Sequence, residues 1–146
     1  MEIKTISVAD IKIIQNLWEK LNLIHLNDST YFKDHFESFT FDERCRSLIL
    51  KDPSEINIEV LFDGQLAEGY CISTFSGESG GIDSIFVDEK FRKHGYGKEL
   101  AERSIKWLKS NNCKNISVSV AEGHESVFSF YEKLGFYPRK TVLQMK

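Results

Sequence analysis

The stretch GGIDSIFVDEKFRKHGYGKELAERSIKWL, from Gly80 to Leu108, decides the fold. Its first part, Ile82 to Val87, carries β-forming side chains on both faces and predicts a strand. A mostly polar turn covers residues 88–94, and Gly95-Tyr96-Gly97 then opens a helix. The helix is predicted because one face repeats at 3.6-residue spacing, through Leu100, Ala101, Ser104, Ile105 and Leu108.

The junction between this strand and this helix has the features of an anion site. Gly95 and Gly97 have no Cβ atoms, so an oxygen atom of a ligand can approach the backbone closely. The first N–H groups of a helix have no partners within it, and the helix dipole favours negative charge there. Arg92, Lys93 and Lys98 add positive charge, and an arginine can hold a phosphate with two donors. The pattern predicts a site for a phosphorylated ligand, although glycines after a strand also occur in simple turns.

Composition restricts the class of protein. With 146 residues, 41% hydrophobic and 28% charged, the chain is predicted to form one globular domain over residues 1–146. No segment approaches the roughly 20 apolar residues of a membrane span, and the first residues do not resemble a secretion signal. Three scattered cysteines without metal-ligand spacing indicate reduced thiols in a cytoplasmic protein and no metal site. We expect no membrane partner, and the net charge of −3 argues against nucleic acid.

The rest of the chain predicts a mixed α/β order. The expected elements are, in chain order, a strand at 3–8, a helix at 11–21, a short helix starting at residue 29 or 30, a helix at 41–50 begun by a Thr40–Glu43 capping box, strands at 57–62 and 66–75 joined by a turn at Asp63-Gly64, a turn at 76–81, a strand at 116–120, a helix at 127–134 ended by Gly135, and a strand at 141–145. We expect a central, mostly antiparallel, twisted sheet with helices on both faces.

Three segments carry a more specific signal. They are IDSIFVDEKFR at 82–92, the R-x-x-G-x-G pattern of Arg92-Lys93-His94-Gly95-Tyr96-Gly97, and Phe130-Tyr131-Glu132-Lys133-Leu134-Gly135-Phe136. They resemble, in turn, the central strand, the pyrophosphate loop and the Y-E-K-x-G-F block of the GCN5-related N-acetyltransferase (GNAT) family. The resemblance extends over residues 80–138 and implies an acyl-CoA N-acyltransferase-like fold, with acetyl-CoA as cosubstrate.

The resemblance also implies which residues hold the cosubstrate. Backbone groups of Ile85, Phe86 and Val87 would face the acetyl carbonyl and the pantetheine arm, and N–H groups near Val87 would polarise the thioester. The pyrophosphate would lie on Arg92, Lys93, His94, Gly95, Tyr96, Gly97 and Lys98. His124 occupies a position where the family often has an asparagine that contacts the cofactor, and an imidazole can also donate or accept a hydrogen bond.

Two residues are candidates for proton transfer. The resemblance implies that Tyr131 protonates the departing thiolate, although an amphipathic core tyrosine would fit the same apolar helix face. Asp83 lies on the central strand and is a candidate general base or amine ligand, or alternatively a carboxylate at a solvated edge. Glu122 is a weaker candidate for the base. Ser119 stands where some protein-acetylating relatives have a catalytic glutamate, which favours Asp83.

The acceptor is predicted more coarsely than the cosubstrate. In the family, the segment after the first helix forms a wall of the acceptor pocket, which makes His25, Asp28, Tyr31 and Phe32 candidates. Residues 1–60 hold eleven acidic and seven basic side chains, which favours a small cationic amine by electrostatic attraction. A protein N-terminus or lysine is an alternative acceptor. A non-catalytic acetyl-CoA sensor and a plain nucleotide-phosphate binder are alternative functions, and a homodimer is possible.

Overall fold

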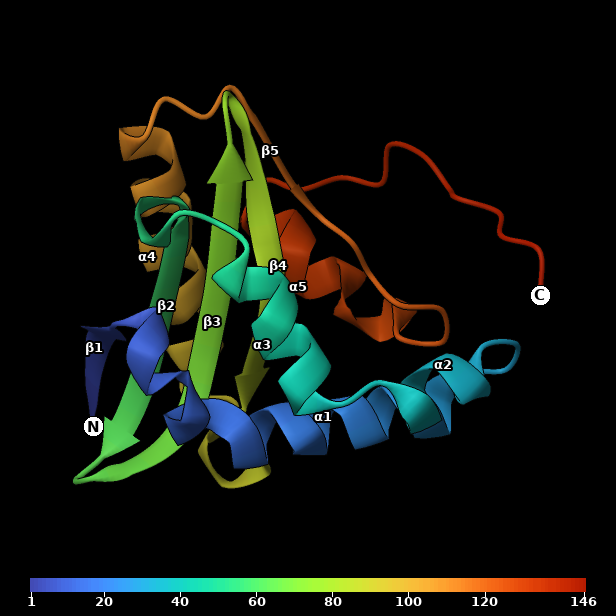
Figure 1. Cartoon of the computed structure of the whole chain (residues 1–146), viewed down its shortest axis with the longest axis horizontal. Coiled ribbons are helices and arrows are strands. Elements are labelled where there is room, and N and C mark those ends of the chain that lie inside the picture. Colours follow the sequence, from blue (N-terminus) through green and yellow to red (C-terminus); the bar gives the residue numbers. More distant parts are fainter.

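Figure 1 shows the computed structural model of the chain, which describes all residues from Met1 to Lys146. Five strands form one sheet in the order β1 (Glu2–Ile6), β2 (Ile56–Asp63), β3 (Leu66–Ser76), β4 (Ser79–Val87) and β5 (Asn115–Val118). The strands β1 to β4 pair antiparallel with their neighbours, whereas β5 pairs parallel with β4. The sheet is therefore mostly antiparallel, as predicted.

Helices cover both faces of this sheet (Figure 1). The α-helices are α1 (Gln15–Asp28), α2 (Lys33–Ser38), α3 (Phe41–Ile49), α4 (Tyr96–Ser110) and α5 (Phe128–Lys133). Short 3-10 helices lie at η1 (Val8–Ile14), η2 (Pro53–Glu55), η3 (Glu89–Phe91) and η4 (Glu125–Val127). The predicted mixed α/β fold is confirmed.

Two apolar clusters, one on each face, hold the helices to the sheet. Along β3, Tyr70 and Ile72 belong to the cluster with α1 and α3, whereas Cys71 belongs to the cluster with α4. Successive side chains of a strand point to opposite faces, so a strand covered on both sides is buried along its length. These three side chains are 0% exposed, and burying one the size of isoleucine contributes about 1.5–3 kcal/mol. β3 is therefore the centre of the core.

The turn at Gly64, the helix end at Gly135 and the helix cap at Thr40 form as the sequence predicts. Gly64, in the turn between β2 and β3, has a φ of +61°, and Gly135, after α5, has a φ of +96°. Both values lie in the left-handed region that glycine tolerates best. The Thr40 hydroxyl accepts a hydrogen bond from the Glu43 N–H at 3.2 Å and so caps α3. The return half of the capping box differs, because the Glu43 carboxylate accepts from the Thr40 hydroxyl instead of its N–H.

Several boundaries differ from the prediction, among them the ends of the strands predicted at 3–8 and 116–120, which are Glu2–Ile6 and Asn115–Val118. The segment predicted as a helix at 11–21 is split, because residues 11–14 belong to η1, Ile14 has non-helical backbone angles, and α1 begins only at Gln15. The short second helix begins at Lys33, since hydrogen bonds to side chains hold the backbone of the preceding residues in a turn. The turn predicted at 76–81 is reduced to two residues, because Ser76 already pairs with Ser79.

The strand predicted at 141–145 is wrong. Residues 134–146 form no helix or strand, and the end of the chain leads away from the sheet (Figure 1). Val142 and Leu143 are 78% and 92% exposed. A β-forming sequence becomes a strand only where a neighbouring strand takes up its hydrogen bonds, and this segment has no such neighbour.

Gly81 provides a test of the β4–β5 pairing. A Cβ atom at this position would overlap the carbonyl oxygen of Ser117 on β5, and that backbone atom cannot move aside without breaking the pairing. We expect Gly81→Ala to lower the free energy of unfolding by about 2 kcal/mol or more. Urea denaturation measures the change.

A matched control for this substitution is Gly97→Ala in α4. A Cβ atom there would lie 3.4 Å from the Phe130 ring, an ordinary contact distance. Alanine favours helix by roughly 0.8–1.0 kcal/mol over glycine, so the control is expected to be as stable as the parent or more stable. Equal stability of Gly81→Ala and the parent would show that β5 does not approach β4 as closely as described.

Candidate functional site

The pairing between β4 and β5 ends about halfway along β4. Their pairing runs from Ser79↔Asn115 to Ile82↔Val118, whereas β4 continues to Val87 with β3 as its one neighbour. The Asp88 N–H donates to the Glu68 carbonyl at 2.8 Å, so the backbone of Phe86, two residues earlier, also faces β3. By the same alternation, the backbone N–H and C=O groups of Ile85 and Val87 face the edge that β5 has left. The Val87 carbonyl accepts a hydrogen bond from Arg92, and the other groups of this half of β4 remain open to a ligand.

Asp83 is the extra residue of a β-bulge at the point of divergence. Ile72 pairs with Ser84 and Ser73 pairs with Ile82, which leaves Asp83 without an opposite residue on β3. Its Oδ2 atom accepts a hydrogen bond from the Thr74 hydroxyl at 2.7 Å and lies 3.4 Å from the Arg44 Nη2 atom. The other carboxylate oxygen, Oδ1, makes neither contact and remains available.

The loop after β4 forms a row of free backbone donors. None of the N–H groups from Lys93 to Lys98 donates a hydrogen bond, and the first intrahelical bond of α4 runs from the Glu99 N–H to the Gly95 carbonyl. Lys93 and Gly95 have φ values of +67° and +83°, which turn the chain into the helix. Consecutive free N–H groups at a helix N-terminus attract anions. The missing side chain of Gly97 faces Phe130 and Val87, which leaves room between α4 and α5.

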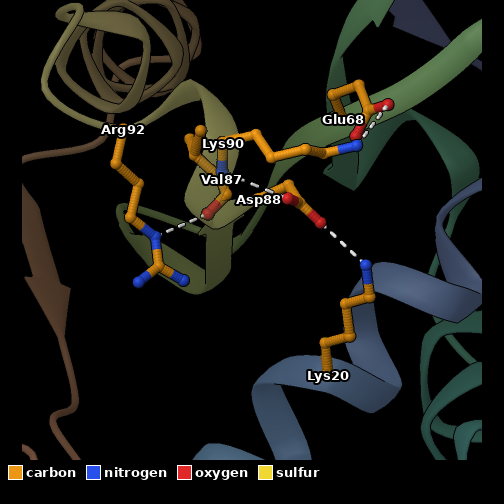
Figure 2. Close-up of polar contacts among 6 residues, drawn as sticks. All are labelled: Lys20, Glu68, Val87, Asp88, Lys90 and Arg92. Atoms are coloured by element: carbon orange, nitrogen blue, oxygen red, sulfur yellow. Dashed lines mark hydrogen bonds and ion pairs between the residues drawn. The ribbon is translucent and has the colours of Figure 1, made fainter.

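Figure 2 shows how the start of this loop is fixed. The buried Asp88 carboxylate accepts a hydrogen bond from the Lys20 ammonium at 2.7 Å and another from the Lys90 N–H at 3.3 Å. The Lys20 contact lowers the pKa of Asp88, and the same hydrogen bond raises the pKa of Lys20. Lys90 also lies 4.0 Å from a carboxylate oxygen of Glu68. Helix α1 is thereby tied to the end of β4.

Arg92 fastens the other side of the loop to the same strand (Figure 2). Its Nε atom donates to the Val87 carbonyl at 2.9 Å, and its guanidinium carbon lies 5.3 Å from the centre of the Phe86 ring. The two terminal nitrogens of the guanidinium make no hydrogen bond with the protein and remain available for a phosphate. Lys93, His94 and Lys98 are exposed around the loop, and Lys98 lies 3.6 Å from Glu102.

Tyr131 is buried next to the free edge of β4. It is 8% exposed and belongs to the same apolar cluster as Val87 and Leu100. The rings of Phe130 and Phe136 meet it edge-on, with centroids at 5.1 and 5.9 Å. Burial raises the pKa of the Tyr131 phenol, so the hydroxyl stays protonated at neutral pH. A neutral phenol in this position can donate a proton or a hydrogen bond.

A pocket of about 200 Å³ lies between helices α1 to α3 and β4. It is lined by Trp18, Leu21, Asn22, His25, His35, Phe36, Phe39, Arg44, Asp83 and Ser84. Two of the residues proposed from the sequence, His25 and Asp83, therefore share one pocket. Burial, and secondarily the neighbouring His124, lower the pKa of His25, so this imidazole is neutral at pH 7.

The other candidates for the acceptor side lie around the rim. The Nδ1 atom of His124 lies 3.4 Å from the Asp28 carboxylate, and its ring centroid lies 5.0 Å from that of His25. These contacts join the end of α1 to the loop before α5. Tyr31 is 64% exposed and does not line this pocket.

Glu122 has a structural role in the same region. Its carboxylate accepts hydrogen bonds from the Tyr31 and Phe32 N–H groups at 3.0 and 2.9 Å, and a further one from the Ser29 hydroxyl. The hydrogen bond from Ser29 lowers the pKa of Glu122. Because these donors occupy Glu122, it holds the turn before α2 and is poorly placed to act as a base. Phe32 is held there through its backbone.

A second, larger pocket of about 500 Å³ adjoins the first. It lies over the paired parts of β3, β4 and β5, and it shares Arg44 and Asp83 with the smaller pocket. Its lining is mainly polar and consists of Arg44, Lys51, Thr74, Phe75, Ser76, Ser79, Gly80, Gly81, Ile82, Asp83, Ser117 and Ser119.

Comparison with known proteins assigns the family. The model of the acetyltransferase (GNAT) family matches residues 17–136. The chain belongs to this family. A relative is the acetyltransferase YE1169 of Yersinia enterocolitica, with 24% identity over 98% of this chain and 92% of the relative. The GNAT fold and the activity class predicted from the sequence, an acetyl-CoA-dependent N-acetyltransferase, are thereby confirmed.

Solved structures agree on the fold. The PaiA N-acetyltransferase of Thermoplasma acidophilum, in complex with coenzyme A, has a TM-score of 0.77 at 15% identity, over 97% of this chain and 94% of its own. The aminoglycoside N-acetyltransferase AAC(6')-Iy, also with CoA, has a TM-score of 0.71 at 14% identity, over 99% and 98% of the two chains. No helix of this GNAT chain has the length and apolar character needed to cross a membrane.

Sequence reasoning missed the residues of this GNAT site that act through tertiary contacts. Lys20 and Asp88 are 68 positions apart. Lys20 belongs to no motif, and Asp88 lies within the motif at 82–92 but carries no signal of a partner on the first helix. Arg44 lies on α3, far in sequence from the bulge that it contacts. Trp18 lies within the helix predicted at 11–21 and has no signal of a site in the sequence. Local sequence patterns do not reveal such residues, because their role depends on how α1 and α3 pack on β4.

The Lys20–Asp88 pair predicts a dependence of stability on pH. Because the folded-state pKa of Asp88 is lowered, its contribution is complete above about pH 4, the usual aspartate pKa, and is lost as the pH falls through the lowered value. We expect Asp88→Asn to cost about 1 kcal/mol at pH 7 and less at pH 3. Urea denaturation at the two pH values measures both differences.

The control is Lys114→Met, which removes a pair with Glu78 in which both side chains are exposed. Such pairs contribute about 0–1 kcal/mol, so a smaller change is expected. If Asp88→Asn lost the same free energy at pH 3 as at pH 7, the carboxylate charge would not be what holds the loop to α1.

Proposed function

We propose that this chain, acting as one domain over residues 1–146, transfers the acetyl group of acetyl-CoA to a primary amine of a small molecule. The observation that carries the proposal is the row of free N–H groups from Lys93 to Lys98, directly beside the free edge of β4. The diphosphate of acetyl-CoA would accept hydrogen bonds from these N–H groups, and its extended pantetheine arm with the thioester would pair with the free edge of β4.

The residues present fit acetyl-CoA. The free N–H groups, the terminal nitrogens of Arg92 and the side chains of Lys93 and Lys98 would hold the pyrophosphate. The edge N–H and C=O groups of Ile85 and the N–H of Val87 would hold the pantetheine arm and the acetyl carbonyl. Two structural neighbours were solved with CoA, which supports the same ligand for this member of the family. The role of His124 toward the cofactor has less support, because its contacts are with His25 and Asp28.

The chemistry needs a proton acceptor for the amine and a proton donor for the sulfur. Acetyl-CoA supplies an activated thioester, whose C–S bond breaks as the new C–N bond forms. The amine arrives mostly as an ammonium with a pKa of about 10.4, so it must lose a proton before it attacks. The free Oδ1 of Asp83 is the proposed acceptor of this proton. The Val87 N–H would stabilise the oxyanion. The Tyr131 hydroxyl would protonate the thiolate and regain its proton from the nitrogen, which gives up a second proton as the amide forms.

A small amine fits the space beside Asp83. The pocket of about 200 Å³ is lined in part by aromatic side chains of α1 and α2, and this size suits a small molecule more than a folded protein. The acidic excess of residues 1–60 supports a cationic amine, and two of the neighbours are named as aminoglycoside acetyltransferases. The three free cysteines support a cytoplasmic location.

The direct test is incubation with acetyl-CoA and a panel of primary amines, with release of free CoA thiol as the readout. The panel includes polyamines, aminoglycosides, amino acids and a lysine-containing peptide. We expect release that depends on a small amine. Binding of acetyl-CoA without release for any acceptor would support a sensor module, and release with the peptide alone would support a protein acetyltransferase.

Removal of the Tyr131 hydroxyl separates chemistry from binding. We expect Tyr131→Phe to lower kcat by about 100-fold, within the range for loss of a general acid, because the thiolate then leaves unprotonated. The dissociation constant of CoA, measured by calorimetry, is expected to change less than about twofold, since the ring still packs in the core. Tyr137→Phe, at a 70% exposed position, is the matched control. An unchanged kcat in Tyr131→Phe would remove the acid role.

Hydrogen exchange tests the pyrophosphate site without any turnover. CoA bound as proposed accepts hydrogen bonds from the N–H groups of residues 93–98 and is expected to slow their exchange about tenfold or more. Residues 139–146 at the exposed end of the chain serve as the internal reference and are expected to exchange at the same rate with and without CoA. Exchange at 93–98 that CoA leaves unchanged would contradict the site.

A further inference from the structure

The larger pocket has an excess of positive charge. Its charged residues are Arg44, Lys51 and Asp83, so two cations face one carboxylate. Arg44 and Asp83 lie 3.4 Å apart and compensate each other. Lys51 is half-buried at the end of α3, and its ammonium has neither an ion pair nor a hydrogen bond within the protein. The pocket therefore contains one uncompensated positive charge.

Hydroxyl groups surround the same space. Ser76 ends β3 and Ser79 begins β4, while Ser117 lies on β5 and Ser119 directly follows it. Hydroxyl and ammonium donors together can satisfy the several acceptor sites of an oxyanion. Phe75 and Ile82 also line the pocket, but their side chains pack on the α4 face, Phe75 against Trp107 and Ile82 in the cluster with Leu100.

We propose that this pocket binds an anionic group, most simply a carboxylate, of the acceptor whose amine lies at Asp83. The inference rests on the proposed function, because it gives the smaller pocket to the amine. Asp83 belongs to both pockets, so an ammonium held at its Oδ1 leaves the rest of the molecule within reach of Arg44 and Lys51. The acceptor is thus zwitterionic, with a primary amine and an acid on one short chain.

This assignment agrees with the charge distribution of the sequence. Residues 1–60 are acidic overall, which favours the approach of an ammonium. Two of the seven cations in that segment, Arg44 and Lys51, nevertheless line one pocket. A guanidinium and an ammonium next to a carboxylate match the two ends of an amino acid better than the uniform positive charge of a polyamine.

Matched acceptors test the proposal. The probes are ω-amino acids with two to six carbons, their carboxamides and the ω-aminoalkyl phosphates of the same lengths. We expect kcat/KM for the best amino acid to exceed that for its carboxamide by about tenfold or more, since a charge-assisted contact contributes on the order of 1.5–3 kcal/mol. A higher kcat/KM for the aminoalkyl phosphate would support an anion site in this pocket and would identify its preferred anion as a phosphate instead of a carboxylate. Equal kcat/KM for acid and carboxamide would overturn the proposal.

Lys51→Met identifies the residue responsible, because it keeps most of the side-chain volume and removes the charge. We expect it to lower kcat/KM for the amino acid about tenfold and to leave the carboxamide unchanged, while Lys51→Arg restores the preference. The control Lys109→Met changes an exposed lysine of α4, on the opposite face of the sheet. Equal losses for acid and carboxamide in Lys51→Met would contradict a contact with the anion.

A binding measurement keeps this test separate from that of the proposed function. Calorimetric titration of the amino acid and its carboxamide into the CoA-bound protein needs no acetyl transfer. Tighter binding of the acid, lost in Lys51→Met, would support the anion site even if no probe were acetylated. Turnover of the acid and carboxamide at equal rates would refute the anion site while leaving the acetyltransferase activity established.

Discussion

The separation of β5 from β4 after the Ile82↔Val118 pair is the constraint on which the rest of the site depends. An isolated strand edge inside a domain leaves backbone donors and acceptors without partners, which is costly unless water or a ligand takes them up. The bulge at Asp83 lies at this point, and a bulge increases the local twist of a strand. The edge of β4, the pockets and the buried Tyr131 all lie around that one divergence.

The close approach of the two strands just before the divergence is equally specific. Gly81 allows the β5 backbone to approach β4 closely at Ser117. One pair later, after Ile82↔Val118, β4 has no further pairing with β5. This abrupt change requires that the free half of β4 be supported from elsewhere. β3 supports it along one edge, and Asp88 supports its end through Lys20 and the Glu68 carbonyl. The strand therefore keeps its extended form where it has only one neighbour.

The parts of this site that the sequence predicts are those with local signals. The strand, glycine turn and helix of residues 80–108 are readable because alternation, positive φ and helical spacing act within a few residues. Asp83 and His25 were found as residues, but their common pocket was not, because it depends on how α1 and α2 lie over β4. The exposed segment at 141–145 shows the opposite error. Its β-forming side chains are a local signal, whereas a strand needs a partner that local sequence does not specify.

The unusual conformation of the loop before α4 is stabilised from outside the loop. A positive φ at Lys93 costs on the order of 1–2 kcal/mol relative to the usual regions. The contacts of Asp88 on one side and Arg92 on the other attach this loop to β4 and α1, and each contact is of comparable size. The N–H groups of residues 93–98 are consequently held in place before any ligand arrives. Binding of a diphosphate therefore costs little backbone entropy in the loop. The contacts of Asp88 and Arg92 thus increase the affinity for the ligand through the order that they impose on the loop.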